Sequence, residues 1–171
     1  GYSGAGSPGV LMPYPANTPT ILLSRDRLAA AGPFLAVAAL ATVSGGLVAA
    51  AGAHAPMQKM VWMAAYLVLV VGVAQAALGA SQALLAIRLP SARVLITECM
   101  LFNAGNAGVI AGTLLSSLSL LLAATLLFAF SLAMFLYTTR GAHGGWPIYA
   151  YRALLVIVAG GAIVGVALVS S

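Results

Sequence analysis

Long apolar runs separated by short polar or proline-containing breaks dominate the chain. Five of these runs are long enough to cross the roughly 30 Å hydrocarbon core of a bilayer, which takes about 20 helical residues. They cover approximately Ala29–Ala53, Met60–Ile87, Val94–Leu115, Leu118–Thr139 and Tyr149–Val169. Because the breaks are brief, consecutive helices should be antiparallel neighbours. The pattern therefore predicts an all-α integral membrane protein, a bundle of five transmembrane helices over residues 29–171.

Residues 1–28 have a different composition and precede the first run. They are rich in proline and glycine, which disfavours regular structure, and they lack the basic and apolar regions of a secretory signal. We expect an extended cytoplasmic tail. It is either a solvated leader or a segment that docks on a partner subunit through apolar residues such as Leu11 and Ile21.

The third run combines a membrane-length apolar segment with polar side chains. On a helix at about 100° per residue the polar residues share one wedge of roughly 140°, and three glycines share a neighbouring wedge of about 60°. The polar residues are Glu98, Cys99, Asn103, Asn106 and Thr113, and the glycines are Gly105, Gly108 and Gly112. Amides form interhelical hydrogen bonds and glycines allow close backbone approach, so both faces are predicted to contact other helices.

The second run presents its own stripe of small and amide residues, which we expect to face the third run. Gly72, Gln75, Gly79, Gln82 and Ala86 lie within about 80° of one another on a helix. Helices two and three are therefore predicted to be the central and tightest pair, with Gly79 and Gly105 in their contact. The fourth helix is rich in leucine and phenylalanine and is predicted to be peripheral. Gly161 and Gly165 form a GxxxG packing pattern in the fifth helix.

Composition excludes several classes of protein. The 171 residues are 63% hydrophobic and only 5% charged, with a mean hydropathy of +1.10, which excludes a water-soluble globule. The net charge of +5 comes from seven basic residues at the ends of apolar runs, so nucleic acid is not an expected partner. The lone Cys99 and two separated histidines, His54 and His143, supply no metal-ligand set, and no metal or cofactor is predicted.

The distribution of basic residues predicts how the chain crosses the membrane. Six arginines fall on the side of the N-terminus, and only Lys59 falls on the other side: the six are Arg25, Arg27, Arg88, Arg93, Arg140 and Arg152. Basic residues concentrate in cytoplasmic loops, so the N-terminus should be cytoplasmic and the C-terminus external in a bacterial inner membrane. Trp62, Tyr137, Trp146, Tyr149 and Tyr151 lie near the predicted helix ends and fit interfacial aromatic belts.

Glu98 is the one acidic residue within the five predicted spans, and two interpretations of its role are possible. An ionisable group in a bilayer costs several kcal/mol unless it is paired or neutralised, so it is a functional candidate. An ion pair with Arg88 or Arg93 would stabilise the connection between helices two and three. Alternatively, Glu98 with the amides of Gln75, Gln82, Asn103 and Asn106 would line a polar path for protons or cations.

These features lead to a ranked expectation of function. The first is a non-catalytic accessory or scaffold subunit that packs in the lipid bilayer against other membrane protein subunits or copies of itself. A small transporter or channel protomer, with the path at Glu98, is the second. A membrane enzyme acting on a lipid or quinone is the third, because no histidine shares the depth of Cys99 to act as a general base.

Overall fold

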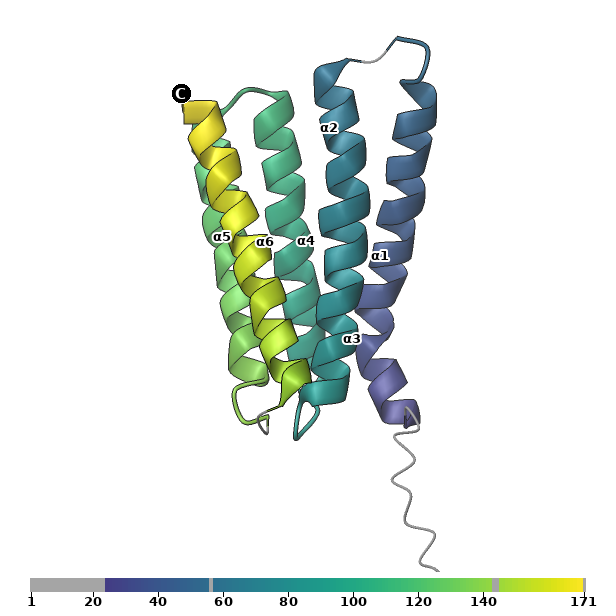
Figure 1. Ribbon diagram of the computed structural model, residues 1–171, viewed down its shortest axis with the longest axis vertical. Helices are drawn as coiled ribbons and strands as arrows, with labels where there is room; N and C mark the ends of the chain where they lie inside the picture. The colour runs from purple at the N-terminus through teal and green to yellow at the C-terminus, as the bar shows by residue number, and fades with distance from the viewer. Residues whose placement is uncertain (1–23, 56, 143–144, 171) are drawn as a thin grey trace, which may run out of the picture.

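The computed structural model describes residues 24–55, 57–142 and 145–170, and the side chains of the last helix as far as Gly160. Within these ranges the regular elements are all helices, arranged as an up-and-down bundle (Figure 1). The elements are α1 (Arg25–Ala51), α2 (Gln58–Tyr66), η1 (Leu67–Ala74), α3 (Gln75–Leu85), α4 (Ala92–Leu114), α5 (Leu118–Thr138) and α6 (Trp146–Ser170). The predicted all-α class is confirmed, and residues 1–23 of the predicted tail lie outside the described residues.

Among the described residues, four helices are long and apolar enough to cross a membrane. They are Arg25–Ala51, Gln58–Leu85, Ala92–Leu114 and Leu118–Thr138, so α2, η1 and α3 together form one continuous second span. The described side chains of α6 add a shorter apolar helix, Trp146–Gly160. By length and composition, the described residues therefore contain four candidate membrane spans and one further apolar helix.

Local capping fixes where two of the helices begin. Ser24 accepts a hydrogen bond from the backbone N–H of Arg27 at 3.4 Å, and Asp26 adds a negative charge in the first turn. The helix α1 consequently begins at Arg25, four residues before the predicted start at Ala29. Ser91 caps α4 in the same way, by accepting from the N–H of Val94 at 3.5 Å.

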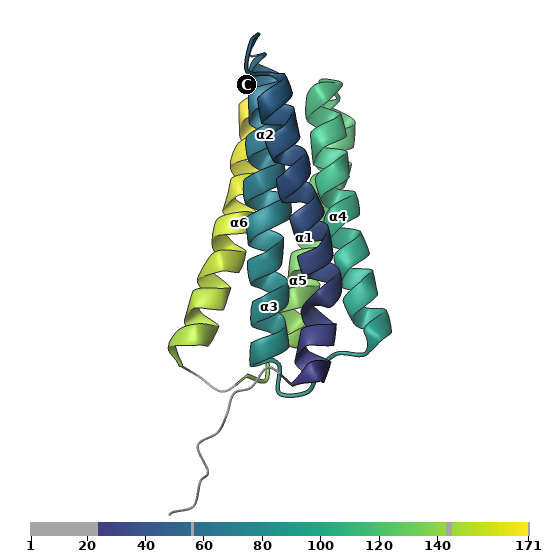
Figure 2. The ribbon, with the colours of Figure 1, turned by 90° about the vertical axis from the view of Figure 1, so that its right-hand side faces the viewer.

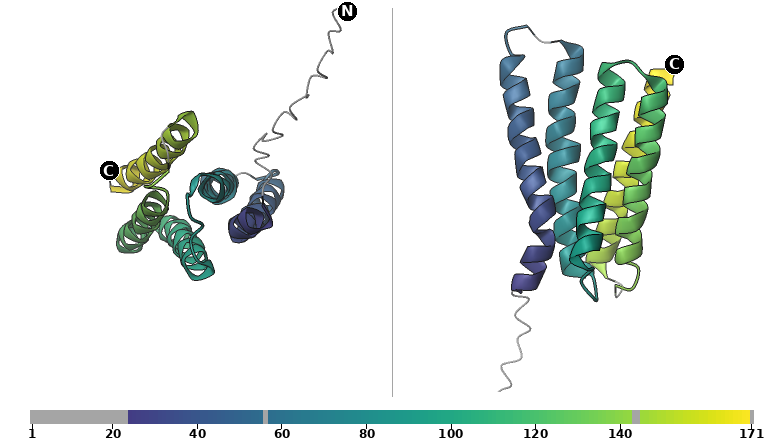
Figure 3. Two further views of the ribbon diagram at one scale, coloured as in Figure 1. Left: turned by 90° about the horizontal axis from the view of Figure 1, so that it is seen from below. Right: turned by 180° about the vertical axis from the view of Figure 1, so that it is seen from behind.

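The second span lies between the other helices. Seen from below, α1 is on one side of it and α4, α5 and α6 are on the other (Figure 3). A quarter turn from the first view, α6 and α4 lie on opposite sides of it (Figure 2). The arginine-bearing helix ends meet at one end of the bundle, which we call the basic end: the start of α1, the α3–α4 and α5–α6 connections, and the start of α6 (lower end in Figure 1).

The most extensive helix contacts are those of α1 with the second span and of α4 with α5. The prediction that helices two and three form the tightest pair is therefore wrong. The prediction of a peripheral α5 is confirmed for Leu126 and Phe130, which are exposed, but is wrong for Phe128 and Phe135, which are buried. Bulky residues of α1 pack against the glycines of the second span, and bulky residues of α5 pack against the glycines of α4. The contact between the second span and α4 is polar.

Four phenylalanines from three helices form the centre of the apolar core. The ring of Phe34 in α1 lies 5.3 Å from that of Phe135, and the ring of Phe102 in α4 lies 5.1 Å from that of Phe128 and 6.1 Å from that of Phe135. Tilted and edge-on contacts at these separations are favourable for aromatic pairs. Tyr151 completes this core by donating a hydrogen bond to the carbonyl of Phe135 at 3.2 Å, so it is buried rather than part of an interfacial belt.

Candidate functional site

A row of polar side chains lies between the second span and α4. We call it the polar seam: Tyr66, Gln75 and Gln82 on the second span, with Glu98, Cys99, Asn103 and Asn106 on α4. Gln75, Gln82 and Glu98 are fully buried, and Asn106 is 1% exposed. From Tyr66 to Gln82 the seam runs roughly 20 Å along the helix, which is most of the ~30 Å core of a bilayer.

Glu98 and Gln82 make the central contact of the seam. The Gln82 Nε2 donates to Glu98 Oε2 at 2.7 Å and to Thr138 Oγ1 of α5, also at 2.7 Å. Thr138 in turn donates to backbone carbonyls of its own helix, with Met134 O at 3.2 Å and Phe135 O at 3.1 Å. One amide therefore links α3, α4 and α5 near the basic end. Thr138 carries no pattern in the sequence that would have identified it.

Arg88 and Arg93, the candidate ion-pair partners of Glu98, lie elsewhere. Both side chains are exposed, at the α3–α4 connection and the start of α4, whereas the Glu98 carboxyl is turned into the bundle. Within the described part of the chain, Glu98 has a hydrogen bond to Gln82 and no ion pair. The burial of the carboxyl between α3 and α4 explains the difference, because exposed arginines at the helix ends do not reach it.

The remaining seam residues form two further groups. Gln75 and Asn103 each donate from their amide nitrogens to Cys99 Sγ at 3.6 Å, and Asn103 also donates to the carbonyl of Cys99 at 2.7 Å. Tyr66, which the sequence reasoning missed, donates its hydroxyl to Asn106 Oδ1 at 2.7 Å. The structure thus brings Gln75, Gln82 and Glu98 to one helix interface, with Asn103 and Asn106 continuing along α4.

Three oxygens of the seam have no hydrogen-bond donor among the described protein groups. They are Gln75 Oε1, Gln82 Oε1 and Glu98 Oε1, and each belongs to a fully buried side chain. A buried acceptor without a partner costs about 1 to 3 kcal/mol, and in a low-dielectric interior such groups bind a donor strongly when one reaches them. A proton on the Glu98 carboxyl or a bound water molecule would supply a donor to these oxygens.

The glycines of the second span face α1 rather than α4. A Cβ on Gly79 would collide with the Phe34 side chain, and one on Gly72 would collide with Thr42 Oγ1. The second span therefore divides its two kinds of residue between two neighbours: glycines contact α1, and glutamines contact α4. The prediction that these glycines and glutamines form one stripe facing the third helix is therefore wrong for the glycines. The eight-residue π-helix η1 has a wider turn than an α-helix, so a constant 100° per residue does not hold there.

The glycines of α4 likewise contact α5. A Cβ on Gly105 would lie 2.9 Å from the backbone N and Cα of Phe128, and one on Gly108 would lie 2.6 Å from the Cβ of Ala124. A Cβ on Gly112 would likewise lie 2.9 Å from the backbone N of Leu121. Both faces of α4 that were predicted to contact other helices do so, but the glycine face packs against α5 and not against the second span. Gly161 and Gly165 lie beyond the described side chains.

Two basic residues bind the carboxyl ends of neighbouring helices, a role that sequence reasoning missed. Arg27 of α1 donates to the carbonyls of Ala83 and Leu84 near the end of α3, the latter at 2.9 Å. At the opposite end of the bundle, Lys59 donates to the carbonyl of Leu114 at 3.2 Å and to Ser116 Oγ at 3.0 Å. The last carbonyls of a helix lack internal partners and carry partial negative charge, so a cation is favourable there.

Metal ligands are not gathered anywhere in the described part of the chain: it holds no group of three or more histidine, cysteine, aspartate or glutamate side chains. His54 is exposed in the α1–α2 connection, and His143 lies outside the described residues. Comparisons of the chain with protein-family models, with curated proteins and with solved structures found no match. The geometry above is therefore the basis for function.

Proposed function

We propose that the protein is a non-catalytic accessory or scaffold subunit of a larger membrane complex in the bacterial cytoplasmic membrane. In this proposal α6 is the fifth span, the N-terminus is cytoplasmic and the C-terminus is external. The 25 residues of α6 amount to roughly 37 Å of helix, enough to cross the core. The arginines at the basic end support a cytoplasmic location for that end.

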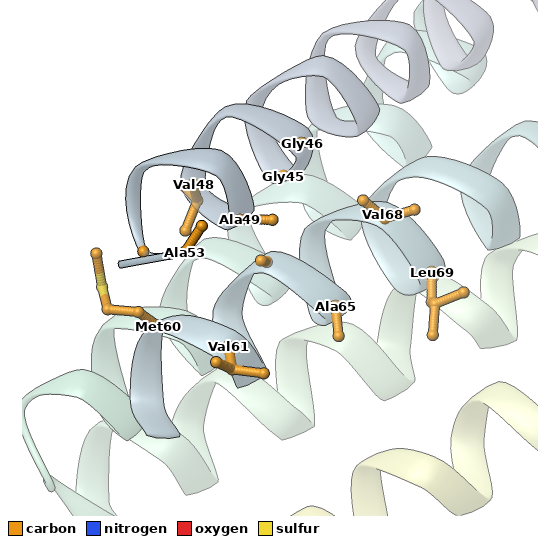
Figure 4. Close-up of a pocket in the computed structure, with 12 residues that line it drawn as sticks. Gly45, Gly46, Val48, Ala49, Ala53, Met60, Val61, Ala65, Val68 and Leu69 are labelled. Atoms are coloured by element: carbon orange, nitrogen blue, oxygen red, sulfur yellow. The ribbon is translucent and has the colours of Figure 1, made fainter. Parts of the chain in front are cut away.

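A groove between α1 and the second span carries the proposal. It has a volume of about 430 Å³ and lies towards the end of the bundle opposite the basic end (Figure 4). Small residues of α1 and of the turn after it line one side, including Gly46, Ala49 and Ala53, and larger residues such as Val61 and Leu69 line the other. A Cβ on Gly46 would meet nothing within 4 Å, so this glycine is not needed for packing inside the bundle.

The chemistry of this groove fits a transmembrane helix of another subunit. Glycine costs about 1 kcal/mol of helix stability relative to alanine and offers no more to lipid chains than leucine would. Small residues in a groove do allow a second helix to approach closely, with its side-chain ridge between the walls. Association of this kind needs no catalytic group and places the contact in the membrane.

The test is to fill the groove and measure assembly. Ala49 lines the groove, whereas Ala50 is also exposed on α1, one residue further round the helix, and does not line it. Full-length wild-type, Ala49→Trp and Ala50→Trp proteins would be expressed in the native host, extracted in mild detergent and sized by native electrophoresis. We expect a large complex for the wild type and for Ala50→Trp, and release of the free subunit for Ala49→Trp. Equal behaviour of the two variants would contradict the proposal.

A second function is favoured by one observation, the three buried oxygens of the polar seam that have no donor. They support proton or small-cation movement along the seam, with Glu98 as the ionisable group. Reconstituted vesicles with an internal pH dye would report such movement. Conduction by the wild type that Glu98→Gln abolishes, with normal folding, would favour transport over the scaffold role. Absence of conduction in both would leave the scaffold proposal as the better account.

A further inference from the structure

A second groove lies at the basic end, between the α3–α4 connection and α5. Its volume is about 860 Å³, twice that of the groove between α1 and the second span. Its floor and walls are apolar, formed by residues such as Val94, Phe130 and Met134, and Thr138 connects it to the polar seam. Two arginines, Arg88 and Arg140, line it as well. No acidic side chain is among the described residues that line this groove.

The position of the two arginines gives the groove a charged mouth and an apolar interior. Arg140 follows the end of α5 and its guanidinium lies over the Tyr137 ring, 3.7 Å from the centroid, which holds the charge beside the groove. Arg88 approaches from the α3–α4 connection on the other side. Both arginines are exposed and neither has an ion pair within the described residues, so their charges are free to meet an anion.

The apolar part of the groove matches the depth of one membrane leaflet. From Phe130 to Thr138 the groove follows roughly 12 Å of α5, close to half of the ~30 Å hydrocarbon core. Phe130 is 58% exposed and Tyr137 is 61% exposed, so the groove is open towards the lipid side. A ligand that fits has an anionic head at the helix ends and an apolar chain that descends along α5.

We propose that this groove is a binding site for one anionic phospholipid of the leaflet at the basic end. Arg88 and Arg140 bind the phosphate of the headgroup, and Phe130, Ala133 and Met134 contact an acyl chain. Basic pockets between transmembrane helices on the cytoplasmic side are suited to anionic headgroups, whose attraction to each arginine near the surface gives about a fivefold gain in affinity. The proposal is independent of whether the protein is a scaffold or a transporter.

The test uses full-length protein in detergent micelles, titrated with phosphatidylglycerol or phosphatidylcholine of the same acyl chains. Bound lipid would be counted by native mass spectrometry. We expect one tightly bound phosphatidylglycerol molecule per protein and weaker binding of phosphatidylcholine. The double variant Arg88→Gln/Arg140→Gln should bind phosphatidylglycerol roughly 25-fold more weakly, the product of the two fivefold effects. The matched control Arg25→Gln/Arg152→Gln removes the same charge from the same end, outside the groove, and should keep wild-type binding.

A second variant tests the apolar part of the groove and keeps both arginines. Ala133 is exposed and lines the groove, so Ala133→Trp should occupy the acyl-chain position and weaken both lipids without altering the core. Equal affinity of the wild type for the two lipids, or an equal loss in the control double variant, would overturn the proposal. So would an Ala133→Trp protein that binds lipid normally but changes its oligomeric state, since the groove would then belong to a protein partner.

Discussion

Replacement of Gly105 by alanine should destabilise the bundle, because this glycine lies directly against the backbone of α5. The added methyl carbon would lie 2.9 Å from the N and Cα of Phe128, about 0.5 Å short of the 3.4 Å at which ordinary contact begins. A backbone cannot rotate out of the way, so α5 must move as a whole. Such a movement also disturbs the contact of the Phe102 and Phe128 rings at 5.1 Å.

Two opposing terms determine the size of the effect. Overpacking of a close contact costs about 1 to 3 kcal/mol. Alanine gains about 1 kcal/mol over glycine in helix propensity, which offsets part of this cost. Gly46 supplies the control, because a Cβ there meets nothing within 4 Å and only the propensity term applies. Gly105→Ala should therefore be less stable than Gly46→Ala by about 1 to 3 kcal/mol, with the propensity terms cancelling in the comparison.

The measurement is reversible unfolding in mixed micelles with increasing SDS, followed by circular dichroism for wild type and both variants. Gly46→Ala should match or exceed the wild type in free energy of unfolding, and Gly105→Ala should fall below Gly46→Ala. If the two variants were equally stable, α4 and α5 would not be in the close contact described, and the assignment of the glycine face to α5 would fail.

Three further results should follow from the described contacts. Glu98→Gln should leave the free energy of unfolding within about 1 kcal/mol of wild type, because the new amide can donate to the unpartnered Gln82 Oε1; a loss above 2 kcal/mol in the same SDS titration would refute this. Lys59→Met should lower stability by about 0.3 to 1 kcal/mol through loss of the cation at the end of α4, whereas an unchanged midpoint would mean that this contact contributes nothing. Single cysteines at His54 and Ala92, both exposed, should react with a membrane-impermeant maleimide from outside and inside respectively; labelling from one side only would contradict the proposed topology.

The contact between Gln82 and Glu98 could be predicted because it depends only on how far each residue lies from the connection between its two helices. Two antiparallel helices joined by a short corner place residues at similar distances from that corner opposite each other. Gln82 and Glu98 lie at similar distances from the corner at Pro90, and the sequence also shows which residues are polar. The ion pair with Arg88 or Arg93 was predicted on the same basis, but the orientation of a long exposed side chain is not determined by its distance from a corner.

The partners of the glycines could not be predicted from the second and third runs alone. A glycine offers space, and the helix that fills the space is decided by the bulky residue available on a third element, Phe34 for Gly79 and Phe128 for Gly105. The π-helix η1 also changes the direction of side chains between Gly72 and Gln75 in a way that apolar residues do not signal. Periodicity identified the buried positions, and side-chain volume elsewhere in the chain selected their neighbours.

The contacts of Arg27 and Lys59 have a consequence for how the chain assembles during synthesis. Arg27 joins α1 to α3, so its contact is available as soon as the second span leaves the ribosome. Lys59 joins α2 to α4, so it waits for the third span. Because α1 packs with the second span and α4 with α5, we expect two hairpins to form separately, N-terminal first, and then to meet along the polar seam. Until they meet, Glu98 and Gln82 have no partners on the opposing hairpin, which makes this the stage of biogenesis most exposed to misassembly.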